Sequence, residues 1–189
     1  MAFRNGMARG GRDRAWPRRE AWWGMLFATL LLWGASGGVA RAQSDFIIQS
    51  IDNDFPSEIA DAAGNDKNLI IFFHQAGCPY CDKMRARVFP DPKVDGYFTK
   101  HFVMIESNIR GSLSVVTPDG KTMTESDFGH KMRVRATPVI VFYDRQGHDV
   151  LRTTGYLDPQ QFYLAGRYVE DGVYKSGKSF FRYLRDQSQ

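Results

Sequence analysis

The two cysteines of this chain, Cys78 and Cys81, are separated only by Pro79-Tyr80 and follow the apolar run from Leu69 to Phe73. Two thiols at this spacing can form and open a disulfide, and the point where a buried strand passes into a helix is a common place for such chemistry. A purely structural bridge is the weaker interpretation, because closing so short a loop removes little entropy from the unfolded chain. The pair is therefore predicted to be a redox-active site.

Different roles are predicted for the two sulfur atoms. Cys78 is expected at the start of a helix, where unpaired backbone N–H groups and the positive end of the helix dipole favour a thiolate. Its pKa is expected to fall below the free-thiol value of about 8.5. Cys81 lies one turn further along, shielded beneath Cys78. We therefore expect Cys78 to attack a partner's disulfide and Cys81 to resolve the mixed disulfide, with no bound cofactor.

The first 42 residues have the order of a secretory signal peptide. Six arginines precede a twelve-residue apolar core from Trp22 to Trp33, and small residues then lead to Ala40-Arg41-Ala42. Cleavage is expected before Gln43, which predicts a periplasmic protein. An uncleaved membrane anchor is the alternative, because residues 22–40 just reach the length that a membrane span needs.

The basic charge of the whole chain comes from this segment. Residues 1–42 hold seven of the 25 Lys and Arg and two of the 21 Asp and Glu, so residues 43–189 carry 18 basic and 19 acidic side chains, a net charge of −1. That balance does not indicate a nucleic-acid surface. The 147 residues from 43 to 189 are enough for one domain with a single core.

Strands and helices are expected to alternate along this domain. The continuous apolar run at 68–73 predicts a strand covered on both faces. Turn residues Pro118-Asp119-Gly120 predict a small hairpin. The expected helices are at 56–63, from Cys78 to a stop at Pro90 and Pro92, at 125–132, from Asp158, and near 180–184; the other expected strands are at 101–107, 139–143 and 148–154. On the helix that begins at Cys78, the charged residues Lys83, Arg85 and Arg87 are expected to face water.

In this order, the elements and the cysteine motif resemble the thioredoxin superfamily over residues 68–169. The residues that carry the resemblance are Phe73, Cys78-Pro79-Tyr80-Cys81, Thr137-Pro138-Val139-Ile140-Val141-Phe142 and Gly147. The resemblance implies an α/β thioredoxin fold: a central mixed sheet flanked by helices, with the hairpin inserted before a cis-proline loop. Thr137–Pro138 would then be cis and face the dithiol, and Thr137 would pair with an extended segment of a partner. An ordinary trans proline opening an edge strand is the alternative.

A narrower resemblance points to the exported thioredoxins of bacterial sulfur-oxidation (Sox) systems. It is carried by Gly77-Cys78 with Tyr80, by the hairpin insert, and by Gly155-Tyr156 with a following Phe162. It implies a monomeric protein-disulfide oxidoreductase that reduces protein disulfides and is itself reduced by a membrane thiol donor. Pro79 and Tyr80 would shape the surface that docks the partner. Because Pro79-Tyr80 also resembles glutaredoxins, a glutaredoxin-like or oxidising dithiol protein is the alternative.

One position departs from the thioredoxin pattern. Thioredoxins usually carry a buried acid six positions before the first cysteine, and Phe72 stands there. Alternation along Phe102, Met104 and Glu106 places Glu106 on one face of a neighbouring strand, from which it could approach Cys81. In an apolar setting its pKa would be raised and it could accept a proton. A solvent-facing glutamate is the alternative.

His74 is the remaining candidate near the dithiol. As an imidazolium it would favour the Cys78 thiolate, whereas many histidines near strand ends take no part in chemistry. His74, Cys78 and Cys81 could also bind copper(I), which would make the protein a thioredoxin-like copper carrier. Such carriers typically separate their cysteines by three residues, so no metal is predicted here.

Overall fold

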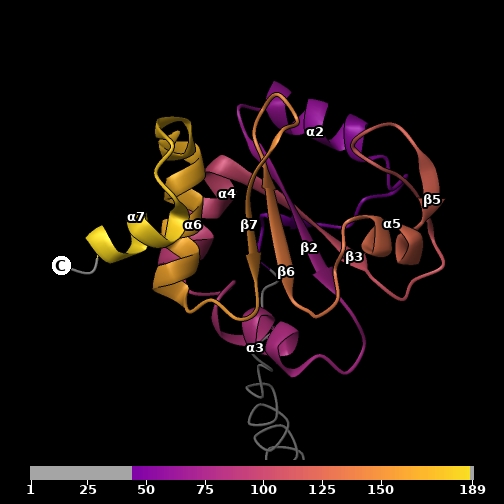
Figure 1. Cartoon of the computed structure of the whole chain (residues 1–189), viewed down its shortest axis with the longest axis horizontal. Coiled ribbons are helices and arrows are strands. Elements are labelled where there is room, and N and C mark those ends of the chain that lie inside the picture. The colour runs from indigo at the N-terminus through magenta and orange to yellow at the C-terminus, as the bar shows by residue number, and fades with distance from the viewer. Residues whose placement is uncertain (1–43, 188–189) are drawn as a thin grey trace, which may run out of the picture. The chain divides into compact units, whose positions relative to one another are not determined.

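The structure is a computed structural model that describes residues 44–187, and the predicted signal peptide lies outside this part of the chain. Within residues 44–187, no helix has both the length and the apolar character needed to cross a bilayer. The elements, shown in Figure 1, are β1 (Ile47–Ile48), α2 (Phe55–Gly64), β2 (Asn68–His74), α3 (Pro79–Arg87), α4 (Pro92–His101), β3 (Phe102–Asn108), β4 (Ser114–Val116), β5 (Thr122–Thr124), α5 (Glu125–Lys131), β6 (Val139–Tyr143), β7 (Asp149–Thr154), α6 (Pro159–Glu170), the 3-10 helix η2 (Val173–Ser176) and α7 (Phe180–Gln187).

A five-stranded sheet in the order β1-β3-β2-β6-β7 forms the centre. It is mixed, because β2 runs parallel to β3 and antiparallel to β6. Strands β4 and β5 form a separate antiparallel hairpin, and its turn contains Gly120 at a φ of 77°. Both the mixed sheet and the small hairpin before residue 137 were expected from the sequence, and both predictions are confirmed.

The side chains of β2 alternate between two layers of helices, as the two-residue period of a strand requires. Ile70 and Phe72 pack with residues of α3, α4 and α6. Leu69, Ile71 and Phe73 pack with residues of α2 and α5. Figure 1 shows α4 and α6 on one side of β2 and α5 on the other. The continuous apolar run is therefore explained by burial on both faces, as predicted.

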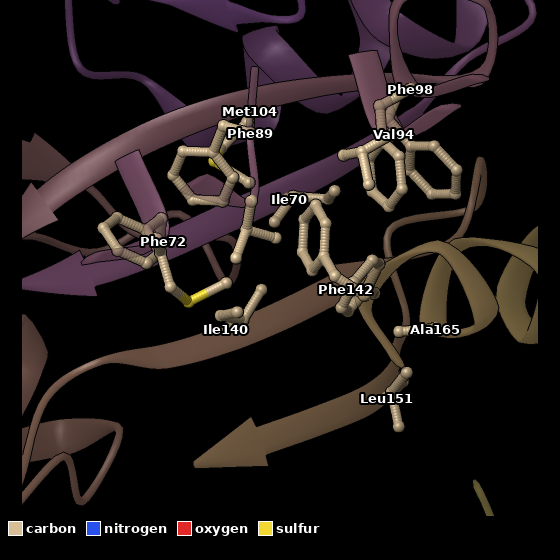
Figure 2. Packing of buried hydrophobic residues seen from close by; sticks show 14 of the residues in the cluster. Ile70, Phe72, Phe89, Val94, Phe98, Met104, Ile140, Phe142, Leu151 and Ala165 are labelled. Atoms are coloured by element: carbon tan, nitrogen blue, oxygen red, sulfur yellow. The ribbon is translucent and has the colours of Figure 1, made fainter. Parts of the chain in front are cut away.

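Aromatic rings fill the layer that supports α3. Phe98 of α4 stacks on Phe162 of α6, with ring centroids 4.3 Å apart and planes at 12°. Phe142 of β6 lies next to Phe162, with ring centroids 6.2 Å apart, and Figure 2 shows Phe142, Phe98 and Phe72 as members of one buried cluster. The buried cluster that contains these rings also contains both cysteines. The α4–α6 packing thus belongs to the same core as the dithiol.

Helix α4 was not expected from the sequence. The prediction used Pro90 and Pro92 as stops for the preceding helix and placed a strand directly at 101–107. Pro92 instead occupies the first turn of α4, where a missing N–H costs nothing because the N–H groups of that turn have no partner within the helix. The Asp91 side chain caps this helix by accepting from two backbone N–H groups at 3.0 and 3.2 Å. Strand β1 and η2 were also not expected.

The close α4–α6 contact makes Gly166 intolerant of a side chain. A Cβ at Gly166 would lie 2.8 Å from Cζ of Phe98 and 3.2 Å from a ring carbon of Tyr97. We expect Gly166→Ala to lower the free energy of unfolding by about 1–3 kcal/mol through overpacking, measured by chemical denaturation. Gly96→Ala is the control, because Gly96 lies inside α4 with no atom within 4 Å of its Cβ position. It should be stabilising by about 0.5–1 kcal/mol. Equal effects of the two changes would contradict the packing argument.

Candidate active site

Cys78 lies where the chain leaves the sheet and enters α3. Strand β2 ends at His74, and Gly77 turns the chain with a φ of 70°, a conformation that favours glycine. Cys78 is the N-cap residue of α3 and has an extended backbone. Pro79 follows in the first turn, where its fixed φ suits the start of a helix. The local sequence therefore places the Cys78 sulfur at the N-terminus of a helix, as predicted.

The two cysteines form a disulfide, so the structure shows the oxidised state. The backbone N–H of Cys81 donates to Cys78 Sγ at 3.1 Å. Cys78 is 4% exposed and Cys81 is 0% exposed. An N–H group that points at the Cys78 sulfur would also stabilise negative charge on it after reduction. The exposed fractions agree with the expectation that a partner reaches Cys78 first.

The peptide bond between Thr137 and Pro138 is cis, as the thioredoxin resemblance implied. The next residue, Val139, pairs with Phe73 near the end of β2. The carbonyl of Pro138 accepts from the N–H of Gly155 at 2.8 Å. These contacts place the cis-proline loop beside the end of β2, close to the start of α3, and anchor the loop that follows β7 next to it.

Glu106 lies on the face of β3 that packs against α3, as the alternation predicted. Its carboxylate accepts from Arg85 Nε at 2.8 Å and from Arg85 Nη2 at 3.0 Å. Arg85 stands one helical turn after Cys81, and its guanidinium also lies over the Phe72 ring, 5.4 Å from the centroid. The apolar setting expected around Glu106 is therefore wrong, because the carboxylate faces a guanidinium and is 29% exposed.

Arg85 was expected to point toward water together with its charged neighbours on α3. Its side chain is instead only 33% exposed, because it reaches across to β3. It also lies 3.4 Å from Asp82 on its own helix. Arg85 follows Cys81 by one helical turn, and this spacing was a signal for a position near the dithiol. Its contact with Glu106 on β3 depends on the fold and has no signal in the local sequence.

His74 lies at the end of β2, beside the same charged pair. Its ring stacks on Phe72 at 6.3 Å and 13°, and its Nε2 lies 3.8 Å from the Glu106 carboxylate. Burial lowers the pKa of His74 below its ordinary value, and the Glu106 charge opposes this only in part. The imidazole is therefore mainly neutral at neutral pH. This weakens the idea that an imidazolium favours the Cys78 thiolate.

Tyr80 lies between the cysteines and is 57% exposed. Its ring centroid is 6.3 Å from that of Tyr156, in the loop after β7. The Lys83 ammonium lies over the Tyr156 ring, 4.1 Å from the centroid. Neither Tyr156 nor Lys83 was predicted from the sequence to belong to the site. The available signal for Tyr156 was an aromatic residue directly after Gly155. This pair was used only as part of the family resemblance.

The described residues do not place His74 and the two cysteines in a metal-binding arrangement. Within residues 44–187, no three or more His, Cys, Asp or Glu side chains are grouped so that they could hold a metal ion.

The lowered pKa of His74 predicts a dependence of stability on pH. The unfolded chain binds a proton at His74 near pH 6.5, whereas the folded chain does so only at lower pH. Stability should therefore fall as the pH decreases from about 7 toward the folded pKa, and should not change through this group above about pH 7. The free energy of unfolding of wild type minus that of His74→Gln should decrease over the same range, measured by denaturation of the oxidised protein. A difference that does not change with pH, or that grows on acidification, would contradict the effect of burial.

Comparison with known proteins places this site in a family context. Over 144 residues the chain is 25% identical to the thiol:disulfide interchange protein DsbD of Photorhabdus laumondii. The matched region covers 73% of this chain and 23% of the relative. The match thus spans about a quarter of that relative. Residues 55–170 match the family model described as a thioredoxin-like domain.

Two solved structures show the same fold. A thioredoxin-fold protein from Helicobacter pylori has a TM-score of 0.56 at 23% identity, over 65% of this chain and 80% of that chain. A putative disulphide-isomerase from Bacteroides thetaiotaomicron has a TM-score of 0.51 at 26% identity, over 70% of this chain and 97% of that chain. The matched family segment contains the Cys78–Cys81 disulfide and the cis-proline loop. The chain therefore belongs to the thioredoxin-like domain family, with the cysteine pair of a thiol–disulfide oxidoreductase.

Proposed function

We propose that this chain is an exported thiol–disulfide oxidoreductase that reduces disulfides in partner proteins. The observation that carries the proposal is the disulfide at the N-terminus of α3, in which Cys78 accepts an N–H bond and Cys81 is fully buried. Membership of the thioredoxin-like family and similarity to a thiol:disulfide interchange protein support this class of reaction.

The reaction begins from the reduced dithiol. The Cys78 thiolate attacks one sulfur of the partner's disulfide, that bond breaks, and the partner's other sulfur leaves as a thiolate and takes up a proton. Cys81 then loses its proton and attacks Cys78 Sγ. The Cys78–Cys81 bond forms and the partner leaves with two thiols. Two electrons pass from the cysteine pair to the partner, and no bound cofactor takes part.

The partner segment would dock between α3 and the cis-proline loop. Thr137 and Pro138 would pair with an extended backbone by strand addition. Pro79 and Tyr80 would form the opposite wall, where Tyr80 has more than half of its surface exposed. Pro79 and Tyr80 directly follow Cys78, and the pairing of Val139 with Phe73 supports a position of the cis-proline wall near it. The docked disulfide would then meet the nucleophile without a large movement of the fold.

The proposal also includes a direction of electron flow, from this chain to its partner, and a compartment outside the cytoplasm. Export rests on the secretory pattern of residues 1–42. The reductant assignment rests on Thr137 before the proline and on the resemblance to the exported thioredoxins of sulfur-oxidation systems. A reductant in an oxidising compartment needs a donor, and a membrane thiol protein would restore the dithiol. Dithiol proteins range from about −270 mV for reductants to about −120 mV for oxidants, so the equilibrium potential tests the direction.

Trapping tests the reaction and identifies the partner. In Cys81→Ser the mixed disulfide at Cys78 should persist, because the resolving sulfur is absent. Non-reducing electrophoresis should then show a covalent complex of this chain with a partner protein. Dithiothreitol should release the partner, and mass spectrometry should identify it. The double variant Cys78→Ser with Cys81→Ser is the control and should recover none. Equal recovery from both variants would refute the proposal, and a potential above about −150 mV would reverse the direction.

Glu106 is our proposed acceptor of the Cys81 proton. It lies on the face of β3 against α3 and is held by Arg85, one turn after Cys81. Glu106→Gln should slow resolution of the mixed disulfide by about 10²-fold and change the pH profile of that step, measured by stopped-flow fluorescence. Asp82→Asn is the matched control, because Asp82 also contacts Arg85 but is 74% exposed. A Glu106→Gln rate and pH profile equal to wild type would dismiss the role.

A further inference from the structure

Three side chains beside the disulfide form what we call the tyrosine–lysine surface: Tyr80, Lys83 and Tyr156. The two rings lie at 36° to each other with centroids 6.3 Å apart. The Lys83 ammonium is 4.1 Å from the centroid of the Tyr156 ring. The surface thus joins the first turns of α3 to the loop after β7.

The position of Tyr156 connects this surface to the cis-proline loop. The preceding residue, Gly155, has a φ of 91° and donates its N–H to the carbonyl of Pro138 at 2.8 Å. The ring of Tyr156 therefore projects from a segment that is hydrogen-bonded to one wall of the proposed docking site, and it contacts Tyr80 on the other. A segment bound to Cys78 and Pro138 would pass along the tyrosine–lysine surface.

The cation on this surface has no acidic partner in the part of the chain that the structure describes. Among residues 44–187, the ion pairs of α3 are made by Arg85, which contacts Asp82 and Glu106, whereas Lys83 contacts no carboxylate. Arg135 is exposed two residues before Thr137 and likewise has no ion pair within the described residues. Both sides of the docking site therefore present positive charge that the described residues do not neutralise.

We propose that the tyrosine–lysine surface selects partner segments that carry an acidic side chain beside the disulfide cysteine. The proposal rests on the function proposed above. The rings would pack against the segment, and Lys83 would pair with its carboxylate. Contact with the Tyr156 ring keeps the ammonium at the site, which reduces the ordering needed when the carboxylate binds. Charge complementarity of this kind raises association rates more than it raises affinity.

The test uses the reduced wild-type chain and three peptide disulfides that differ at one residue next to the cysteine: Glu, Gln or Lys. Second-order rate constants for their reduction are measured by release of a quenched fluorophore. Wild type should reduce the Glu peptide about threefold to tenfold faster than the Lys peptide at low salt, and the ratio should approach one in 1 M salt. If a substitution elsewhere changes the reactivity of Cys78, all three peptides are affected equally, so the change cancels in the ratio.

Lys83→Glu should reverse the ratio, Lys83→Gln should bring it close to one, and Tyr156→Ala should reduce it. Arg87→Glu is the matched control, because it makes the same charge change on an exposed residue one turn further along α3. It should keep the preference for the Glu peptide. A wild-type ratio of one at low salt, or equal changes in Lys83→Glu and Arg87→Glu, would overturn the proposal.

The Gln peptide distinguishes failure of this inference from failure of the proposed function. If wild type reduces the Gln peptide but has no preference between Glu and Lys, the acidic-segment proposal is wrong and the dithiol chemistry stands. If wild type reduces none of the three peptides, the proposed function is wrong and the acidic-segment proposal falls with it.

Discussion

The hydrogen bond from the Cys81 N–H to Cys78 Sγ, at 3.1 Å, depends on where β2 ends and α3 begins. Strand β2 is buried on both faces, so a one-residue slip would move every side chain into the wrong layer. Its end is therefore fixed, and the turn through Gly77 and Pro79 must start the helix within a few residues. The core of the domain thus sets the position of one sulfur atom.

The two cysteines share one chemistry and differ only in their surroundings. Because α3 packs Cys81 against the aromatic layer of α4 and α6, that sulfur is closed to a macromolecule, whereas Cys78 keeps a small exposed area at the helix end. The pairing of β6 with β2 brings the cis-proline loop to the same place. Access to Cys78 and burial of Cys81 therefore follow from one packing arrangement, and the proposed order of attack rests on this difference in access.

Features set by local sequence were predictable, and those set by tertiary partners were not. The buried run of β2, the cysteine motif and the Asp119-Gly120 turn each carry their signal within a few residues. Helix α4 was missed because Pro92 is compatible with a helix start as well as a helix end, and the sequence does not decide between them. Arg85 was placed in water because a charged residue on a helix usually is, but its partner lies on another strand. The contact between Tyr80 and Tyr156 likewise depends on the fold.

The charges around the dithiol form one connected arrangement. An apolar ring at Phe72 excludes an acid from β2, and the carboxylate is supplied from β3 by Glu106, where Arg85 can reach it from α3. Glu106 is partly exposed, so the proton that we propose it accepts could pass from it to solvent more readily than from an acid enclosed in the core. Arg85 serves Asp82 as well as Glu106, and this leaves Lys83 without a carboxylate on α3. Arg85 therefore pairs with the carboxylates that contact α3, and Lys83 keeps its charge on the tyrosine–lysine surface, over the Tyr156 ring.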